Sequence, residues 1–307
     1  MSDQTSIQHS KNRQQGLLIF GEVLYDCFED GTEVLGGAPF NVAWSLRGFG
    51  LSPTLVSSIG NDAAGLGIKN AMHNWGLDTS GLQTHAELAT GRVSIEIKND
   101  EPSYSICQPR AWDAIAFPQN LELSKVQLMY HGSLALRSEK SRESFEQMIN
   151  QIKPKRFFDV NLRAPHYTVD AVLSLVEGVE WLKLNTDELS LLLGRKVAFD
   201  NCRSSVEELR TAYRVKNVIL TGEKNGAIIL GEYGEAAVKP APIPEPMVDS
   251  VGAGDAFAAT TICGVLQRRS AAEIVATASR FASKVCTTSG ATVHDRDFYA
   301  INFKTTC

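Results

Sequence analysis

The segment 249–257 constrains this chain more than any other stretch. It contains Gly252, Ala253, Gly254 and Asp255, and apolar residues at helical spacing follow it, so the glycines are expected where a loop becomes a helix. A helix N-terminus offers free N–H groups and a positive dipole end, which suit phosphate, and glycines let the backbone approach an anion closely. Asp255 would lie in the first helical turn, where it could take a proton from an attacking hydroxyl. The alternative interpretation is a tight turn followed by an acidic residue, because short glycine motifs are weak signals.

Alternating apolar runs and amphipathic segments predict the fold class. Repeated β-α units predict an α/β fold with a mostly parallel sheet and helices on both faces. In such sheets ligands bind beyond the carboxyl ends of the strands. Strands are expected at 126–132, 156–161, 180–185 and 217–221, and helices at 139–152, 168–178, 186–194, 205–214, 254–267 and 271–287. Polar residues expected at the strand ends are Asp159, Asn161, Arg163, Lys183, Asn185, Glu188, Thr221 and Gly222.

The N-terminal half contains two candidate projections from this sheet. Alternation across turns predicts hairpins at about 23–35 and 91–107. Between them, the run 36–41 reads Gly-Gly-Ala-Pro-Phe-Asn, and its proline suits the first turn of a helix. This run is either a glycine-rich turn that caps a helix or a pocket floor that binds hydroxyls through backbone N–H groups and the Asn41 amide.

Composition excludes several classes of protein. The net charge of the 307 residues is −5, so the chain lacks the basic footprint of a nucleic-acid-binding protein. Its apolar runs are far shorter than the ~20 residues of a membrane span. Residues 1–15 are polar and are expected to form a disordered tail. The six cysteines show no CxxC pair, which is typical of free thiols in a cytoplasmic chain.

Segment 249–257 closely resembles the C-terminal signature of the ribokinase-like (PfkB) carbohydrate kinases, Asp-x-x-Gly-Ala-Gly-Asp-x-Phe. The resemblance extends from about residue 17 to 293. It implies a three-layer α/β/α kinase domain at 16–307, a β lid formed by 23–35 and 91–107, and transfer of a phosphoryl group from ATP with Mg²⁺. Asp255 is then the catalytic base and 252–254 the anion hole.

The same resemblance assigns the other binding residues. The sugar would be bound by Asp26, Gly36, Gly37 and Asn41, with Arg110 and Arg163 available as cations. The Asn-x-x-Glu element would hold Mg²⁺ through water, using Asn185 and Glu188. The nucleotide would contact Lys183, Asn185 and the loop with Thr221, Gly222 and Gly226. Arg163 and Lys183 could instead be strand-end ion pairs, which reveal little about function.

The acceptor is less constrained. Ala38-Pro39 replaces the Lys-Gly of ribokinases and phosphosugar kinases, and this form looks like the fructokinases, as does the run 159–163. The resemblance therefore favours fructose, phosphorylated to fructose 6-phosphate. The segment 109–113 departs from the fructokinase form. The alternatives are 2-keto-3-deoxygluconate, another hexose, a nucleoside, and a non-catalytic sugar or nucleotide sensor.

The family also implies a monovalent cation, K⁺, beside the anion hole, and a homodimer through the β lid is a further expectation. Water or Lys284 could satisfy the same carbonyls instead of the cation. The matching backbone positions are Asp249, Val251, Val285, Thr288 and Gly290.

Overall fold

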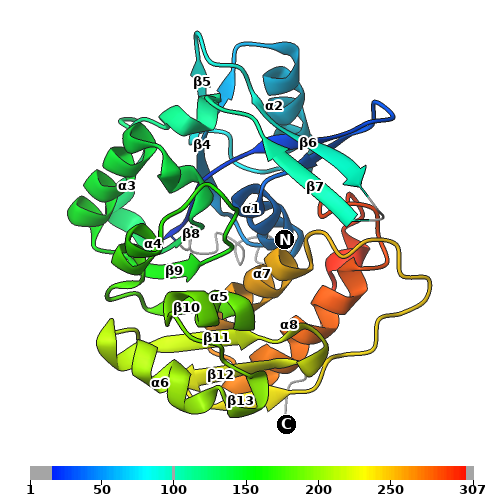
Figure 1. The fold of residues 1–307 in the computed structure, drawn as a ribbon. Coiled ribbons are helices and arrows are strands. Elements are labelled where there is room, and N and C mark those ends of the chain that lie inside the picture. The colour runs from blue at the N-terminus through cyan, green and yellow to red at the C-terminus, as the bar shows by residue number, and fades with distance from the viewer. Residues whose placement is uncertain (1–15, 99–100, 302–307) are drawn as a thin grey trace, which may run out of the picture.

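A central sheet of nine strands organises the chain, and Figure 1 shows it flanked by helices. The computed structural model describes residues 16–98 and 101–301. The expected tail at 1–15 lies outside these residues. The strand order is β13-β12-β11-β10-β9-β8-β1-β4-β5, and all neighbours are parallel except the pairs β11/β12 and β12/β13. The strands are β1 (Gly16–Phe20), β4 (Thr54–Gly60), β5 (Leu82–His85), β8 (Val126–His131), β9 (Lys155–Asp159), β10 (Trp181–Asn185), β11 (Asn217–Thr221), β12 (Ala227–Gly231) and β13 (Ala236–Val238).

Helices cover both faces of this sheet, which confirms the predicted three-layer α/β/α fold. The central strands are apolar along nearly their whole length because both of their faces are buried. In β1, Leu17 and Ile19 enter one core, whereas Leu18 and Phe20 enter the core on the opposite face. The first face packs against α1 (Ala38–Gly48), α2 (Ala63–Trp75), α7 (Ala253–Leu266) and α8 (Ala271–Val285). The second packs against α3 (Glu139–Ile152), α4 (Val169–Val176), α5 (Thr186–Leu192) and α6 (Arg203–Ala212).

The two predicted projections combine into one small sheet of four strands. Its order is β3-β2-β6-β7, with β2 (Leu24–Phe28), β3 (Glu33–Gly36), β6 (Gly91–Lys98) and β7 (Glu101–Ile106). Each hairpin is antiparallel, and the parallel pairing of β2 with β6 joins them. Leu24, Val93 and Ile95 form a separate small apolar cluster within it. Segments far apart in sequence therefore meet over one edge of the main sheet.

Local signals explain where the helices begin. Asp62 caps α2 through a 2.8 Å hydrogen bond from the Gly65 N–H to Oδ1, and Pro39 lies in the first turn of α1. Both features suit a helix N-terminus. The short strand β5 and the 3₁₀ helix η3 (Leu134–Arg137) were not predicted, because four residues are too few to establish a periodicity. No helix in the described ranges is long and apolar enough to cross a membrane.

Candidate active site

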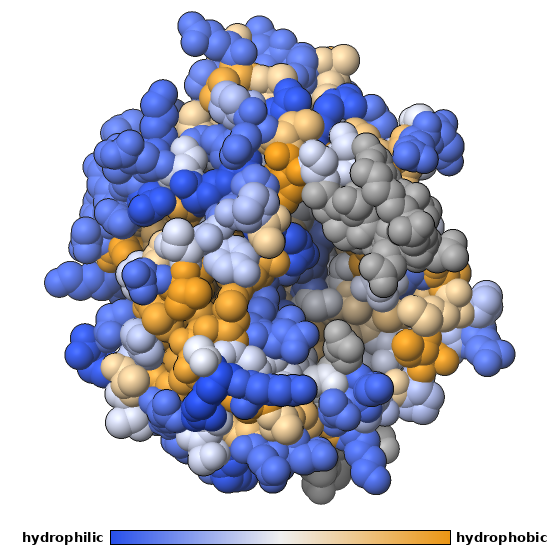
Figure 2. Space-filling model, viewed as in Figure 1, coloured by the Kyte–Doolittle hydropathy of each residue, from blue (hydrophilic) through white to orange (hydrophobic). Residues whose placement is uncertain are grey.

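One cavity of about 480 Å³ collects most of the residues predicted to bind the sugar. It lies where β1, β8 and β9 end, between the N-terminus of α7 and the small sheet. Figure 2 shows a hydrophilic hollow near the centre of this face, next to where Figure 1 draws α7 and β7. The polar and charged side chains lining the cavity are Glu22, Asp26, Asn41, Ser133, Asn161, Arg163, Ser250 and Asp255.

The N-terminus of α7 forms one wall of this cavity. Gly252 is the N-cap, with φ of 82°, and a Cβ there would lie 2.3 Å from Cβ of Ala291. Both the left-handed backbone and the close approach therefore require glycine. The fourteen-residue helix α7 follows, as predicted for a loop that becomes a helix. Asp255 lies in its first turn, as predicted.

Asp255 is held by a side chain from the other end of the sequence. Nδ2 of Asn41, in α1, donates a 2.8 Å hydrogen bond to Oδ2 of Asp255. Burial raises the pKa of Asp255 to about 6, the Asn41 hydrogen bond lowers it, and the Asp159 carboxylate raises it. Asp255 can therefore exist in both protonation states near neutral pH, which suits a general base.

Asp26 reaches the same cavity from β2. Burial raises its pKa to about 6, and the charge of Arg163 opposes this shift. A Cβ at Gly36 would lie 2.7 Å from Oδ2 of Asp26, so Gly36 leaves room for this carboxyl. Gly37, with φ of 103°, caps α1 and lines the cavity itself.

Lys183 and Asp159 form a buried ion pair at the ends of β10 and β9. Nζ of Lys183 lies 2.9 Å from both carboxylate oxygens of Asp159. Although burial opposes the charge of Lys183, the carboxylate raises its pKa above the usual value. A Cβ at Gly254 would lie 3.6 Å from this Nζ. The ammonium group therefore lies next to the backbone of segment 252–254, the predicted anion hole.

The Asn-x-x-Glu element forms the N-terminal cap of α5. Oδ1 of Asn185 accepts from the Glu188 N–H at 2.8 Å, and Oε2 of Glu188 accepts from the Asn185 N–H at 2.8 Å. Oε1 of Glu188 accepts from the Leu162 N–H at 2.9 Å. Each carboxylate oxygen of Glu188 keeps a lone pair free. Asn185 and Glu188 therefore fit a hydrated Mg²⁺ bound mainly through water. A direct cage is not present: no cluster of three His, Cys, Asp or Glu among the described residues could hold a metal.

Three residues predicted to contact the nucleotide border a second cavity, of about 310 Å³. Asn185, Thr221 and Gly222 line it; Thr221 is the last residue of β11, and Gly222 follows it. The Gly222 N–H donates to the Gly226 carbonyl at 2.8 Å, which closes a tight loop. Gly226 has φ of 98°, and a Cβ there would lie 2.0 Å from the Val238 carbonyl oxygen. The second cavity thus opens at the same edge of the sheet as the first.

The sequence and fold comparisons agree with this geometry. The family model described as pfkB family carbohydrate kinase matches residues 14–296. This chain belongs to the PfkB family of carbohydrate kinases.

Its relatives include proteins described as sugar kinases and fructokinases. A relative from Pyrococcus horikoshii, described as an uncharacterized sugar kinase, is 30% identical over 76% of this chain and 73% of its own length. A fructokinase from Klebsiella pneumoniae is 24% identical over 80% of this chain and 83% of its own length. The structure of a fructokinase from Xylella fastidiosa with bound ATP superposes with a TM-score of 0.80, at 19% identity, over 94% of this chain and 97% of that one.

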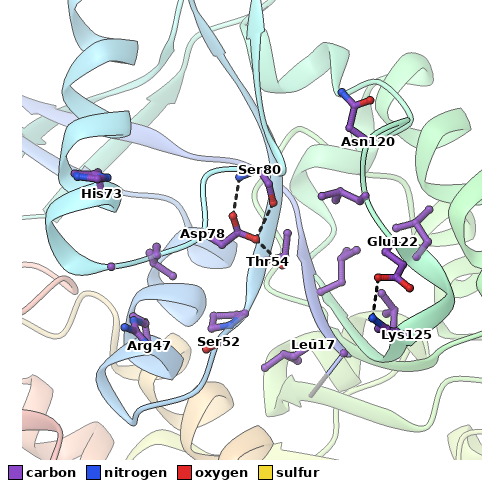
Figure 3. Close-up of a pocket in the computed structure, with 18 residues that line it drawn as sticks. Leu17, Arg47, Ser52, Thr54, His73, Asp78, Ser80, Asn120, Glu122 and Lys125 are labelled. Carbon is purple, nitrogen blue, oxygen red and sulfur yellow. Dashed lines mark hydrogen bonds and ion pairs between the residues drawn. The ribbon is translucent and has the colours of Figure 1, made fainter. Parts of the chain in front are cut away.

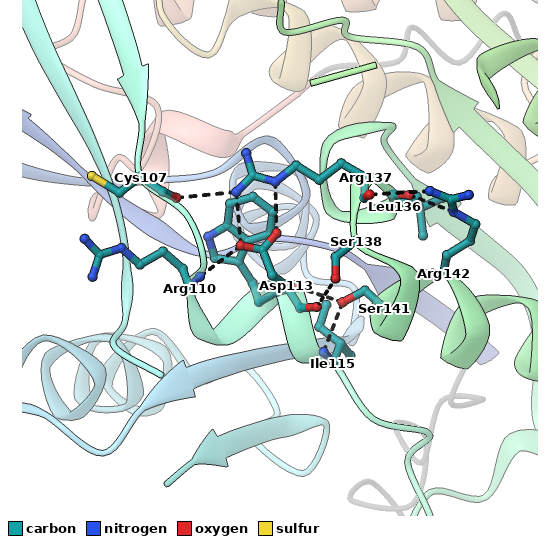
Figure 4. Close-up of polar contacts among 10 residues, drawn as sticks. Cys107, Arg110, Asp113, Ile115, Leu136, Arg137, Ser138, Ser141 and Arg142 are labelled. Atoms are coloured by element: carbon teal, nitrogen blue, oxygen red, sulfur yellow. Dashed lines mark hydrogen bonds and ion pairs between the residues drawn. The ribbon is translucent and has the colours of Figure 1, made fainter. Parts of the chain in front are cut away.

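The two arginines expected near the sugar of this PfkB kinase differ in position. Arg163 lines the 480 Å³ cavity, and its charge lowers the pKa values of Glu22, Asp26 and Asp255. Arg110 does not line that cavity, and Figure 4 shows its side chain extending away from Arg137. The backbone N–H of Arg110 instead donates to Oδ2 of Asp113 at 2.9 Å.

The carbonyls proposed for a monovalent cation lie on two adjoining segments, 249–251 and 285–290. The Val248 and Asp249 N–H groups donate to the Cys286 carbonyl, which joins the segments. The Val285 carbonyl already accepts from the Thr288 hydroxyl at 2.8 Å. Nζ of Lys284 donates to the Phe298 carbonyl at 2.7 Å, so Lys284 is directed to another partner.

Sequence reasoning assigned no role to three of the polar residues that line the cavity: Ser250, in the loop before α7, and two residues that follow strands. Glu22 follows β1 and Ser133 follows β8, and both line it. The rule that polar residues at strand ends face a ligand was applied only to the strands from β9 onward. The same rule applied to β1 and β8 would have found both residues.

A further cavity, of about 640 Å³, lies at the opposite edge of the main sheet, where β1 and β4 begin. Figure 3 shows two groups of polar side chains there that bind one another, Asp78 with Ser80 and Thr54, and Glu122 with Lys125. Oδ2 of Asp78 accepts from Ser80 at 2.7 Å, and Nζ of Lys125 lies 2.8 Å from Oε2 of Glu122. Because ligands of parallel sheets bind at the carboxyl edge, the 480 Å³ cavity is the candidate active site.

Proposed function

We propose that this PfkB kinase transfers the γ-phosphoryl group of ATP to a primary hydroxyl of a free neutral sugar, with fructose as the preferred acceptor and fructose 6-phosphate as the product. One observation carries the proposal. The 480 Å³ cavity, called the acceptor cavity below, is lined by the carboxyl groups of Glu22, Asp26 and Asp255 and by the guanidinium group of Arg163.

Asp255 acts as the general base in this proposal. The acceptor oxygen forms a bond to the γ-phosphorus, the bond from that phosphorus to the bridging oxygen of ADP breaks, and the hydroxyl proton passes to Asp255. Asn41 fixes the orientation of the carboxyl group through Oδ2.

The surrounding cations and dipoles stabilise the charge of the transferring group. The N–H groups of 252–254 at the start of α7 face developing negative charge on the phosphoryl oxygens. Lys183 supplies a positive charge beside Gly254. Mg²⁺ bound near Asn185 and Glu188 through water would neutralise phosphate charge.

The charges of the cavity favour a neutral acceptor. A sugar phosphate brings about two negative charges to a site that already holds three carboxyl groups, and like charges in a confined site repel. The carboxylate of 2-keto-3-deoxygluconate meets the same repulsion, and among the described residues Arg163 is the one cation that lines the cavity. Fructose brings only hydroxyl groups, which carboxyl and amide oxygens can bind.

We further propose that the small sheet closes over the bound acceptor as a lid. Leu24, Val93 and Ile106 of the small sheet line the cavity, so closure would exclude water and limit hydrolysis of ATP. We also propose that two copies of the chain pair through these sheets. Light scattering would test this pairing, because a monomeric mass would contradict it.

An acceptor panel tests the proposed function. Release of ADP is coupled to a spectrophotometric reaction, and kcat/KM is measured for fructose, glucose, ribose, adenosine, 2-keto-3-deoxygluconate and fructose 6-phosphate. Fructose is expected to give the highest value. A preference for fructose 6-phosphate or adenosine of more than tenfold, about 1.4 kcal/mol of transition-state binding, would contradict the proposal.

A further inference from the structure

Glu22 is a fully buried acid with an unpartnered oxygen. Its side chain is 3% exposed, and Oε2 has no hydrogen-bond partner. Asp113 and Asp159, the other two fully buried acids among the described residues, are each bound by a cation at 2.9 Å. An unsatisfied buried polar atom costs about 1–3 kcal/mol, so the lone oxygen of Glu22 needs an explanation.

The position of Glu22 supplies that explanation. The residue lies two positions after the end of β1 and lines the 480 Å³ cavity with Asn41 and Asp255. Oδ1 of Asn41 is also buried without a partner. Two hydrogen-bonding atoms in one cavity therefore await groups that the protein does not supply, and a polyhydroxyl ligand can satisfy both.

The charges around Glu22 are compatible with this use. Burial raises its pKa to about 7, Arg163 and Arg137 lower it, and Asp255 raises it. In either protonation state a carboxyl oxygen can accept a hydrogen bond from a hydroxyl, and the protonated form can also donate one.

We propose that Glu22 is a specificity-determining residue that hydrogen-bonds, through Oε2, to an acceptor hydroxyl other than the one that is phosphorylated. The phosphorylated hydroxyl belongs to Asp255, which takes its proton. The inference rests on the proposed function only in requiring a polyhydroxyl acceptor. It assigns a role to Glu22 that the sequence motifs did not provide.

A cycle of variants and substrate analogues tests this contact. Glu22→Ala and Glu22→Gln are assayed with fructose, its 1-, 3- and 4-deoxy analogues, and 2,5-anhydromannitol, which lacks the anomeric hydroxyl. Glu22→Ala is expected to lower kcat/KM for fructose about 10- to 100-fold, with a smaller loss for Glu22→Gln, which keeps an accepting oxygen. For one analogue the loss of kcat/KM caused by Glu22→Ala should shrink below about threefold. That analogue lacks the hydroxyl that Glu22 binds, so the wild-type enzyme has already lost the contact. An equal loss for every analogue, or wild-type kinetics in Glu22→Ala, would overturn the proposal.

Thermal unfolding without ligand provides a readout that needs no acceptor. Replacing a residue that serves only binding does not destabilise the ligand-free protein. Glu22→Gln is therefore expected to keep the melting temperature or raise it by about 2 °C. Asp113→Asn, at a buried acid that is bound by Arg137, is the matched control and should lower it. A decrease in Glu22→Gln equal to that in Asp113→Asn would show a structural role and overturn the inference.

The failure of each proposal can be recognised separately. If the wild-type enzyme does not phosphorylate fructose but accepts another neutral sugar, the proposed acceptor is wrong. The cycle is then measured with deoxy forms of that sugar. Coupling to one of its hydroxyls would support the Glu22 contact, and uniform losses would contradict it.

Discussion

Nδ2 of Asn41 lies 2.8 Å from Oδ2 of Asp255, although 214 positions separate the two residues in the sequence. This contact joins the first turns of α1 and α7 at one point of the cavity. It occupies one carboxylate oxygen of Asp255, and we expect Oδ1 to take the proton of the acceptor. The run 36–41 and the segment 249–257 therefore meet in one cavity.

The substitution Asp255→Asn should abolish most of the activity. The amide keeps the size of the side chain but cannot accept the proton, so kcat is expected to fall about 10²- to 10⁴-fold. Calorimetry should find nearly unchanged affinity for ATP. Asp170→Asn, an exposed acid in the first turn of α4, is the matched control and should leave kcat unchanged. Near-normal turnover in Asp255→Asn would show that another group is the base.

Activity should rise with pH through about 6. The base must be ionised to accept a proton, and burial raises the pKa of Asp255 to about 6, so kcat/KM is expected to fall as the pH drops below that value. Asp26, with a pKa raised to about 6, and Glu22, with one raised to about 7, also face the cavity, so the measured values belong to the group. The check is kcat/KM between pH 5 and 9. Greater activity at pH 5 than at pH 7 would contradict an ionised carboxyl base.

The buried pair of Arg137 and Asp113 should be important for stability. Nε and Nη2 of Arg137 donate to the two carboxylate oxygens of Asp113 at 2.9 and 3.0 Å, as Figure 4 shows. Nη2 also contacts the Cys107 carbonyl at 3.4 Å, and the guanidinium lies 4.2 Å from the centroid of the Trp112 ring. Removing one partner leaves a buried charge, so Arg137→Ala is expected to lower the free energy of unfolding by about 3–5 kcal/mol.

Urea unfolding followed by circular dichroism would measure this loss. The matched control is Arg203→Ala, which removes an ion pair with Glu235 whose two side chains are more than half exposed. Such exposed pairs contribute little to stability. Equal effects of the two substitutions would contradict a special role for the buried pair.

A monovalent cation should support activity. We propose that backbone carbonyls of Asp249, Val251, Val285, Thr288 and Gly290 hold K⁺ beside the anion hole. Lys284 is bound to the Phe298 carbonyl and is not available to replace the ion. Activity in tetramethylammonium buffer is expected to rise on addition of millimolar K⁺ and to respond little to Li⁺. Equal rates in all three salts would contradict the cation site.

Local motifs were enough to predict much of the fold and the segment around Asp255. The loop-to-helix transition at Gly252 is encoded within nine residues, and the strand-end rule identified both Asp159 and Lys183. Their pairing across β9 and β10 depends on strand order, which no single segment records.

Side-chain direction was beyond the sequence. Arg110 and Arg163 were both expected at the sugar, but of the two only Arg163 lines the 480 Å³ cavity, and the Arg110 side chain extends away from Arg137. The carboxyl groups of Glu188 and Glu22 also differ in their surroundings, which the sequence does not reveal. Glu188 is bonded to two backbone N–H groups, whereas Oε2 of Glu22 has no partner, and only packing distinguishes these environments.

The most direct test of the central claim is the identity of the product formed from fructose and ATP. Phosphorus–proton correlation NMR of the reaction mixture distinguishes phosphate esters at the two primary carbons of the sugar. We expect fructose 6-phosphate, formed one-to-one with ADP and absent when Asp255→Asn replaces the wild-type enzyme. ADP formed without a sugar phosphate, or a phosphate ester at another carbon, would contradict it.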